Sequence, residues 1–167
     1  MFATVLPKLA EMSSRPSGPS LSWEQPLAVL GLIACIAALA FLFVRRELLA
    51  AGPAGWAVQA AAVALWLWAR GTLGRRSLNP TPEPTPGGLV THGPYRWWRH
   101  PLYAAIIWFA FATAVSRRTE ATWAAFVVVF AGLGVRMWAE ERHLAQAFPG
   151  DYPPHAARTK RLLPGVW

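Results

Sequence analysis

Twelve consecutive residues, HGPYRWWRHPLY from His92 to Tyr103, gather reactive and aromatic side chains in an otherwise apolar chain. They include two histidines, two arginines, two tyrosines and two tryptophans, and they lead directly into a hydrocarbon segment. Aromatic rings can contact a cation, whereas arginine and histidine can bind an anion. A connection between two helices does not need this mixture, so the stretch is a candidate binding or catalytic segment.

A second polar segment, RMWAEERHL, runs from Arg136 to Leu144. Arg136 and Glu140 are four residues apart and share one face of a helix, and His143 follows on the same stripe. Glu141 is turned about 100° away, which predicts that the two glutamates have different roles. Ionisable groups beside apolar helices are costly, and a functional interpretation is therefore preferred.

The two polar segments are expected to lie side by side. Uncharged runs over 101–115 and 121–135 flank a short turn, which predicts an antiparallel helical hairpin. His100 lies eighteen residues before Arg118 and Glu140 lies twenty-two residues after it. These separations correspond to about 27 Å and about 33 Å along the two helices, so both residues end at nearly the same depth.

The uncharged segments predict an all-α integral membrane protein. Residues 27–44 and 48–69 contain no charged residue, and each is close to the ~20 apolar residues that span a bilayer. Together with the hairpin they predict four transmembrane helices, over about 26–44, 50–69, 101–115 and 121–148. The alternative, a soluble helical bundle, would require a charged face along each helix, which these segments lack.

The net charge of +8 is informative through its location. If the N-terminus is cytoplasmic, twelve of the sixteen basic residues lie in the N-terminal arm, the loop over 70–100 and the C-terminal end, and four lie on the opposite side. This asymmetry predicts that both termini are cytoplasmic. Nucleic acid is not an expected partner, because the charges flank hydrocarbon segments as orientation signals do.

The remaining features describe one domain. Residues 1–22 are rich in serine and proline and predict a flexible arm, and residues 23–167 predict a single membrane domain. Four prolines between Pro80 and Pro86 favour extended chain in the longest loop. Cys35 is the only cysteine and is expected to pack as a small apolar residue.

Simpler interpretations of the polar groups remain open. Arginine, tyrosine and tryptophan at a helix end can serve as interfacial anchors, and Arg136 with Glu140 could form a simple ion pair. Glu140 and His143 have the spacing of one di-iron ligand pair, but no second pair accompanies them, so no metal is expected. The glycines in Gly93-Pro94 and Gly87-Gly88 favour a site, because an anchor needs no tight backbone turn.

The combination of LVTHGPYRWWRHPLY, EERHLAQAFPGDY and a C-terminal RLLP resembles the isoprenylcysteine carboxyl methyltransferase family, within a wider group of membrane phospholipid methyltransferases. The resemblance covers roughly the C-terminal half. Two positions depart from the family pattern: Ala105 stands where many members have glycine, and Gly87-Gly88 offer only backbone before Leu89. Neither departure removes a charged group.

The resemblance implies S-adenosylmethionine as cofactor, in a cytoplasmic-face pocket formed by the loop before the third helix, the third and fourth helices and the C-terminal tail. Arg136 falls where the family places a substrate-side arginine. The implied cofactor contacts are Leu89, Val90, Tyr95, His100, Pro101, Leu102, Tyr103 and Glu140.

The predicted function is S-adenosylmethionine-dependent methyl transfer to a lipophilic or membrane-embedded acceptor, including a carboxylate, that reaches the site from the bilayer. Two alternatives stay open: a membrane protein that kept the fold for binding or assembly only, and a nicotinamide-dependent membrane reductase.

Overall fold

The computed structural model of the chain describes residues 23–74 and 88–162. Four long helices dominate it: α2 (Glu24–Val44), α3 (Gly52–Leu73), α4 (Pro101–Arg117) and α5 (Glu120–Ala147). A 3-10 turn, η2 (Gly93–Arg96), precedes α4, and a short helix, α6 (Tyr152–Arg158), follows α5. The predicted N-terminal arm and most of the proline-rich stretch lie outside the described residues.

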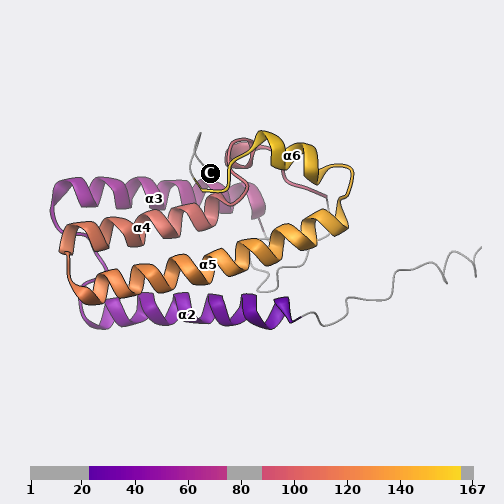
Figure 1. The fold of residues 1–167 in the computed structure, drawn as a ribbon. Coiled ribbons are helices and arrows are strands. Elements are labelled where there is room, and N and C mark those ends of the chain that lie inside the picture. The colour runs from indigo at the N-terminus through magenta and orange to yellow at the C-terminus, as the bar shows by residue number, and fades with distance from the viewer. Residues whose placement is uncertain (1–22, 75–87, 163–167) are drawn as a thin grey trace, which may run out of the picture.

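The long helices lie side by side in the order α3, α4, α5, α2 (Figure 1). α5 packs against both α2 and α4, and α3 packs against α4 and η2. The predicted hairpin is therefore present, with its turn closed by Arg118 in the left-handed region at φ 57°. The Thr119 side chain caps α5 by accepting a hydrogen bond from the Thr122 backbone N–H at 3.2 Å.

The interior is built largely from small side chains on α4 and larger ones on α5. Alanines of α4, such as Ala104 and Ala110, face Val129 and Leu133 of α5. Cys35 is 3% exposed, and its Sγ lies 3.5 Å from the Val129 carbonyl, so its predicted role as a buried apolar residue is confirmed. Small residues let apolar helices approach closely, which is how helices associate in a bilayer.

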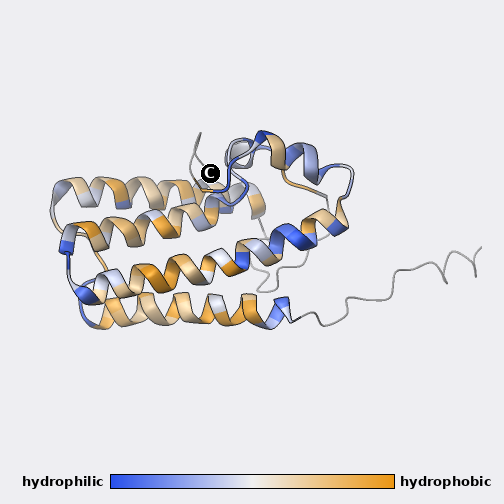
Figure 2. Ribbon diagram, viewed as in Figure 1, coloured by the Kyte–Doolittle hydropathy of each residue, from blue (hydrophilic) through white to orange (hydrophobic). Residues whose placement is uncertain are grey.

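Large apolar side chains also point outward along the bundle. Ile33, Phe43, Leu67 and Val127 are all more than half exposed. The hydropathy colouring shows the same arrangement, with apolar residues along the helices and polar residues gathered at the helix ends (Figure 2). Exposed apolar surface of this extent is typical of a protein that associates with a membrane.

Helix bounds agree closely with the expected ones, with two differences. α3 continues to Leu73, so the first residues of the predicted loop are helical. α6 was not predicted; it starts beside Pro153-Pro154, and proline fits a first helical turn. Two helices, α2 and α5, are long and apolar enough to cross a membrane, and α4 is apolar but shorter at 17 residues.

The two bundle ends differ in their polar contacts. Gln59 of α3 is 5% exposed, and its amide binds the α2–α3 loop and α4: its Oε1 accepts from the Ala50 N–H at 3.0 Å, and its Nε2 donates to Thr113 Oγ1 at 2.9 Å. Thr113 Oγ1 in turn donates to the Leu48 carbonyl at 2.8 Å. This network fixes the loop against α3 and α4 and leaves the opposite end for the candidate site.

α2 and α5 approach each other closely at Gly31 and Gly132. A Cβ added to Gly132 would lie 2.6 Å from the Gly31 carbonyl oxygen and 2.9 Å from Cys35 Sγ. Backbone cannot move aside as a flexible side chain can, so Gly132→Ala should separate the helices and destabilise the protein by about 1–3 kcal/mol. Thermal unfolding in detergent measures this loss.

Gly134 provides the matched control, because a Cβ there would meet nothing within 4 Å. Gly134→Ala should leave the melting temperature unchanged or raise it slightly, since alanine favours helix by about 0.8–1 kcal/mol over glycine. Equal melting temperatures for the two variants would show that the glycine contact is unimportant.

Candidate functional site

The predicted convergence of the two polar segments is confirmed. His100 is the residue before α4, and Glu140 lies in the last third of α5. His100 Nδ1 lies 3.6 Å from Glu140 Oε2, and the Tyr103 hydroxyl donates a hydrogen bond to Glu140 Oε1. The His100 and Tyr103 rings stack with centroids 5.6 Å apart. The start of α4 and the polar part of α5 therefore form one cluster.

Arg136 completes this cluster from within α5. Its side chain is 5% exposed, its Nε donates to the Tyr103 hydroxyl at 2.7 Å, and the same Nε lies 3.3 Å from Glu140 Oε1. A buried guanidinium without a partner would cost several kcal/mol, and the i,i+4 glutamate supplies the opposite charge. The ion pair expected from the simpler interpretation exists, but Tyr103 and His100 join it, so it is part of a larger polar cluster.

Glu141 contacts a different set of groups, as the helical spacing predicts. Its side chain is 12% exposed and pairs with Arg99 Nη1 at 3.1 Å and with Arg161 Nη2 at 2.6 Å. It also lies 3.3 Å from His100 Nε2. Glu140 therefore belongs to the α4–α5 cluster, Glu141 joins the loop and the C-terminal tail, and His100 touches both carboxylates.

The tail is held against the loop by backbone contacts as well. The Arg99 N–H donates to the Lys160 carbonyl at 2.7 Å, and the Lys160 N–H donates to the Trp97 carbonyl at 3.1 Å. Leu162 is 4% exposed and packs into the core beside α4. The tail thus covers the loop that carries the candidate residues.

The turn η2 docks the loop on the end of α3. Gly93 adopts φ +59°, and a Cβ there would lie 2.6 Å from Thr72 Oγ1, so both its conformation and its space favour glycine. Tyr95 is 8% exposed. Burial raises the pKa of its hydroxyl, and the negative charge of Glu140 raises it further.

The other predicted cofactor contacts are less closely joined to the cluster. Pro101 is buried and Leu102 half-buried in the first turn of α4, beside His100. Leu89 and Val90 are half-buried and precede η2. His92 is exposed. The structure brings His100, Tyr103 and Glu140 of the predicted set together, while the role of each predicted residue toward a ligand remains a prediction.

The sequence predicted Arg99 and Glu141 near the site, and Arg161 in the tail that forms part of the pocket, but it gave none of the three a partner. The contact of Glu141 with the loop could have been predicted, because Glu141 lies on a different face of the helix from Glu140. The position of Arg161 follows from α6 and from the tail's pairing with Trp97 and Arg99, and no periodic pattern indicates either.

Comparison with known families places the chain among the methyltransferases. The family model for phospholipid methyltransferase matches residues 49–151, which is more than half of the chain. The chain therefore belongs to the phospholipid methyltransferase family, the wider group that its motifs resemble. Searches of curated proteins and of solved structures find no match. The matched residues include the cluster around Glu140, whereas α2 and the tail with Arg161 lie outside them.

The pairing of Arg161 with Glu141 yields a test of the tail. Arg161→Gln should remove a charge-assisted contact that is one-third exposed on the arginine side, so a loss of about 1 kcal/mol is expected. Backbone hydrogen exchange should become faster at 159–162 because the tail opens locally more often.

Arg158→Gln is the control, since Arg158 is exposed on α6 and the described residues include no ion-pair partner for it. It should leave exchange at 159–162 unchanged. Unaltered exchange in Arg161→Gln would contradict the view that Glu141 holds the tail.

Proposed function

We propose that the chain catalyses S-adenosylmethionine-dependent methyl transfer to a lipophilic acceptor. The observation that carries the proposal is the cluster of Glu140, Tyr103 and Arg136 at the ends of two apolar helices in a member of the phospholipid methyltransferase family. Methyl transfer needs little acid–base chemistry, and most of its acceleration comes from holding the reactants in line. A rigid, buried polar cluster suits that task.

The residues of the cluster fit the chemistry of the cofactor. S-adenosylmethionine supplies an electrophilic methyl group on a sulfonium and also carries an ammonium, a carboxylate and an adenine ring. The Glu140 side chain is 20% exposed and offers an anion for the ammonium. The aromatic rings of Tyr95 and Tyr103 can face the sulfonium. Backbone N–H groups in the first turn of α4 lack helical partners and can bind the carboxylate together with His100.

Arg136 is the residue we assign to the acceptor. Its guanidinium is held by Glu140 and Tyr103 and is preoriented to bind an anionic nucleophile such as a carboxylate. A lipophilic acceptor would reach it from the bilayer between helices. We further propose that all four long helices cross the membrane with both termini in the cytoplasm, because basic residues are concentrated toward the site end.

The first experiment measures cofactor affinity. Glu140→Gln should weaken the binding of S-adenosylhomocysteine ten- to a hundred-fold, because it removes a charge-assisted hydrogen bond of about 1.5–3 kcal/mol. Glu141→Gln should change affinity much less and lower thermal stability instead, since its partners are Arg99 and Arg161. Calorimetry on the full chain in detergent measures both effects.

Titration of the wild type with NADPH separates the alternatives. Binding of NADPH without S-adenosylhomocysteine would favour a reductase and overturn the proposal. Equal loss of S-adenosylhomocysteine affinity in Glu140→Gln and Glu141→Gln would show that the division of roles between the two carboxylates is wrong.

The second experiment compares two histidines of the same loop. His100 is 5% exposed and touches both carboxylates, whereas His92 is exposed. His100→Ala should therefore remove most transfer of labelled methyl groups to an added lipid extract while the protein stays folded, and His92→Ala should retain most of it. Full activity in folded His100→Ala would mean that the loop is an interfacial anchor.

A further inference from the structure

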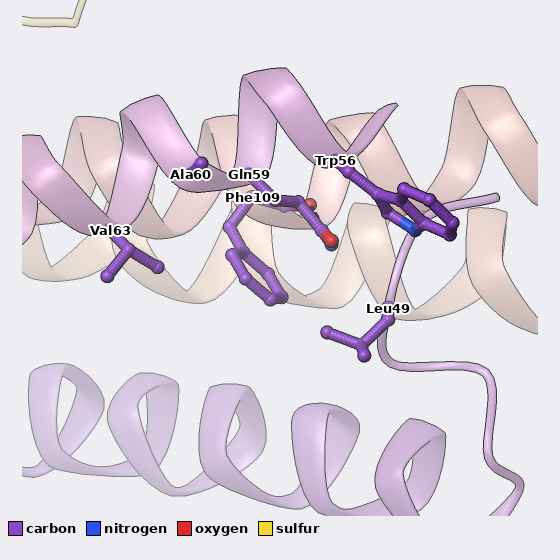
Figure 3. Close-up of a pocket in the computed structure, with 6 residues that line it drawn as sticks. All are labelled: Leu49, Trp56, Gln59, Ala60, Val63 and Phe109. Carbon is purple, nitrogen blue, oxygen red and sulfur yellow. Dashed lines mark hydrogen bonds between the residues drawn. The ribbon is translucent and has the colours of Figure 1, made fainter. Parts of the chain in front are cut away.

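A groove of about 400 Å³ lies on the bundle away from the candidate site (Figure 3). It is bounded by α3, α4 and the α2–α3 loop, and its lining residues are Leu49, Trp56, Gln59, Ala60, Val63 and Phe109. Phe109 lies six residues beyond Tyr103, which is about 9 Å farther along α4 from the cluster. The groove is thus a separate feature near the loop end of the bundle.

The groove is apolar despite the presence of Gln59. The Gln59 amide is fully engaged, because its Oε1 accepts from Ala50 and its Nε2 donates to Thr113. The other lining residues are apolar, and Leu49, Trp56 and Val63 are 59%, 58% and 45% exposed. An open groove lined by apolar side chains can accommodate an alkyl chain, and it offers few hydrogen-bonding groups to a polar ligand.

Arg117 contacts the backbone of one residue that lines this groove. The Arg117 Nε donates a hydrogen bond to the carbonyl of Leu49, a lining residue. Within the described part of the chain, the two terminal nitrogens of Arg117 make no hydrogen bond or ion pair. The neighbouring carboxylate, Glu47, is bound by Arg45 at 3.1 Å and by the Thr119 hydroxyl at 3.2 Å. The Arg45 hydrogen bond is the largest cause that lowers the Glu47 pKa, and the Arg117 charge makes only the last contribution. The Arg117 guanidinium can therefore bind an external anion.

The residues around Arg117 are of the types that face lipid headgroups, namely basic residues and a tryptophan. Four arginines, against two glutamates, lie in the loop over 45–51 and the turn over 116–120. Trp56 donates its indole N–H to the Ala50 carbonyl at 2.7 Å beside the groove. Tryptophan at this depth is typical of the boundary between hydrocarbon and headgroups.

We propose that this groove binds an anionic phospholipid of the leaflet at the α2–α3 loop. One acyl chain lies along Trp56 and Val63, and the phosphate binds the terminal nitrogens of Arg117, whose planar fork suits phosphate oxygens. This lipid is distinct from the methyl acceptor, and its binding rests on the proposed membrane crossing of α3 and α4 but not on methyl transfer.

The test measures lipid retention by the full chain in detergent with native mass spectrometry. The probes are phosphatidylglycerol and phosphatidylcholine with identical acyl chains. The wild type should retain phosphatidylglycerol in preference. Arg117→Gln should weaken that retention about fivefold, since one basic residue near a lipid surface contributes about that factor. Arg118→Gln, an exposed neighbour, should keep the preference.

A second variant tests the groove itself. Ala60→Trp fills the channel at an exposed helix position and should reduce retention of both lipids, even if Arg117→Gln proves unstable. The proposal is overturned if the wild type shows no preference, if Arg118→Gln loses it as much as Arg117→Gln, or if Ala60→Trp retains both lipids like the wild type.

Discussion

The burial of the Arg136 guanidinium is the constraint on which the rest of the structure depends. The residue is 4% exposed in a helix whose other residues are mostly apolar, and an uncompensated charge there would cost several kcal/mol. Glu140 supplies the opposite charge from one turn away, and the Tyr103 hydroxyl bridges the two from α4. That bridge sets the alignment of α4 on α5 and so determines which residues can meet at the bundle end.

Several features could be predicted from the sequence because helical geometry determines them. The depth of His100 relative to Glu140 follows from the rise per residue and the short turn at Arg118. Glu140 and Glu141 contact different residues because successive side chains on a helix point about 100° apart. The bounds of α2, α4 and α5 were predicted to within about two residues, which is the usual uncertainty at helix ends.

Other features depend on tertiary placement and leave no periodic signal. The tail returns to the loop through α6, a seven-residue helix, and only this return brings Arg161 to Glu141. At the opposite end, Gln59 is the one polar residue in an apolar stretch, and its buried amide network with Ala50 and Thr113 depends on how the α2–α3 loop folds back. The apolar groove beside it, like the network, is a product of packing between α3 and α4.

If Tyr103 and Glu140 act as one unit toward the cofactor, a double-mutant cycle should reveal their coupling. Calorimetric affinities for S-adenosylhomocysteine would be measured for the wild type, Tyr103→Phe, Glu140→Gln and the double variant. We expect a coupling energy larger than about 0.5 kcal/mol, because Tyr103→Phe removes the hydrogen bond that joins the two side chains and Glu140→Gln removes the charge that strengthens it. Losses that simply add would contradict it.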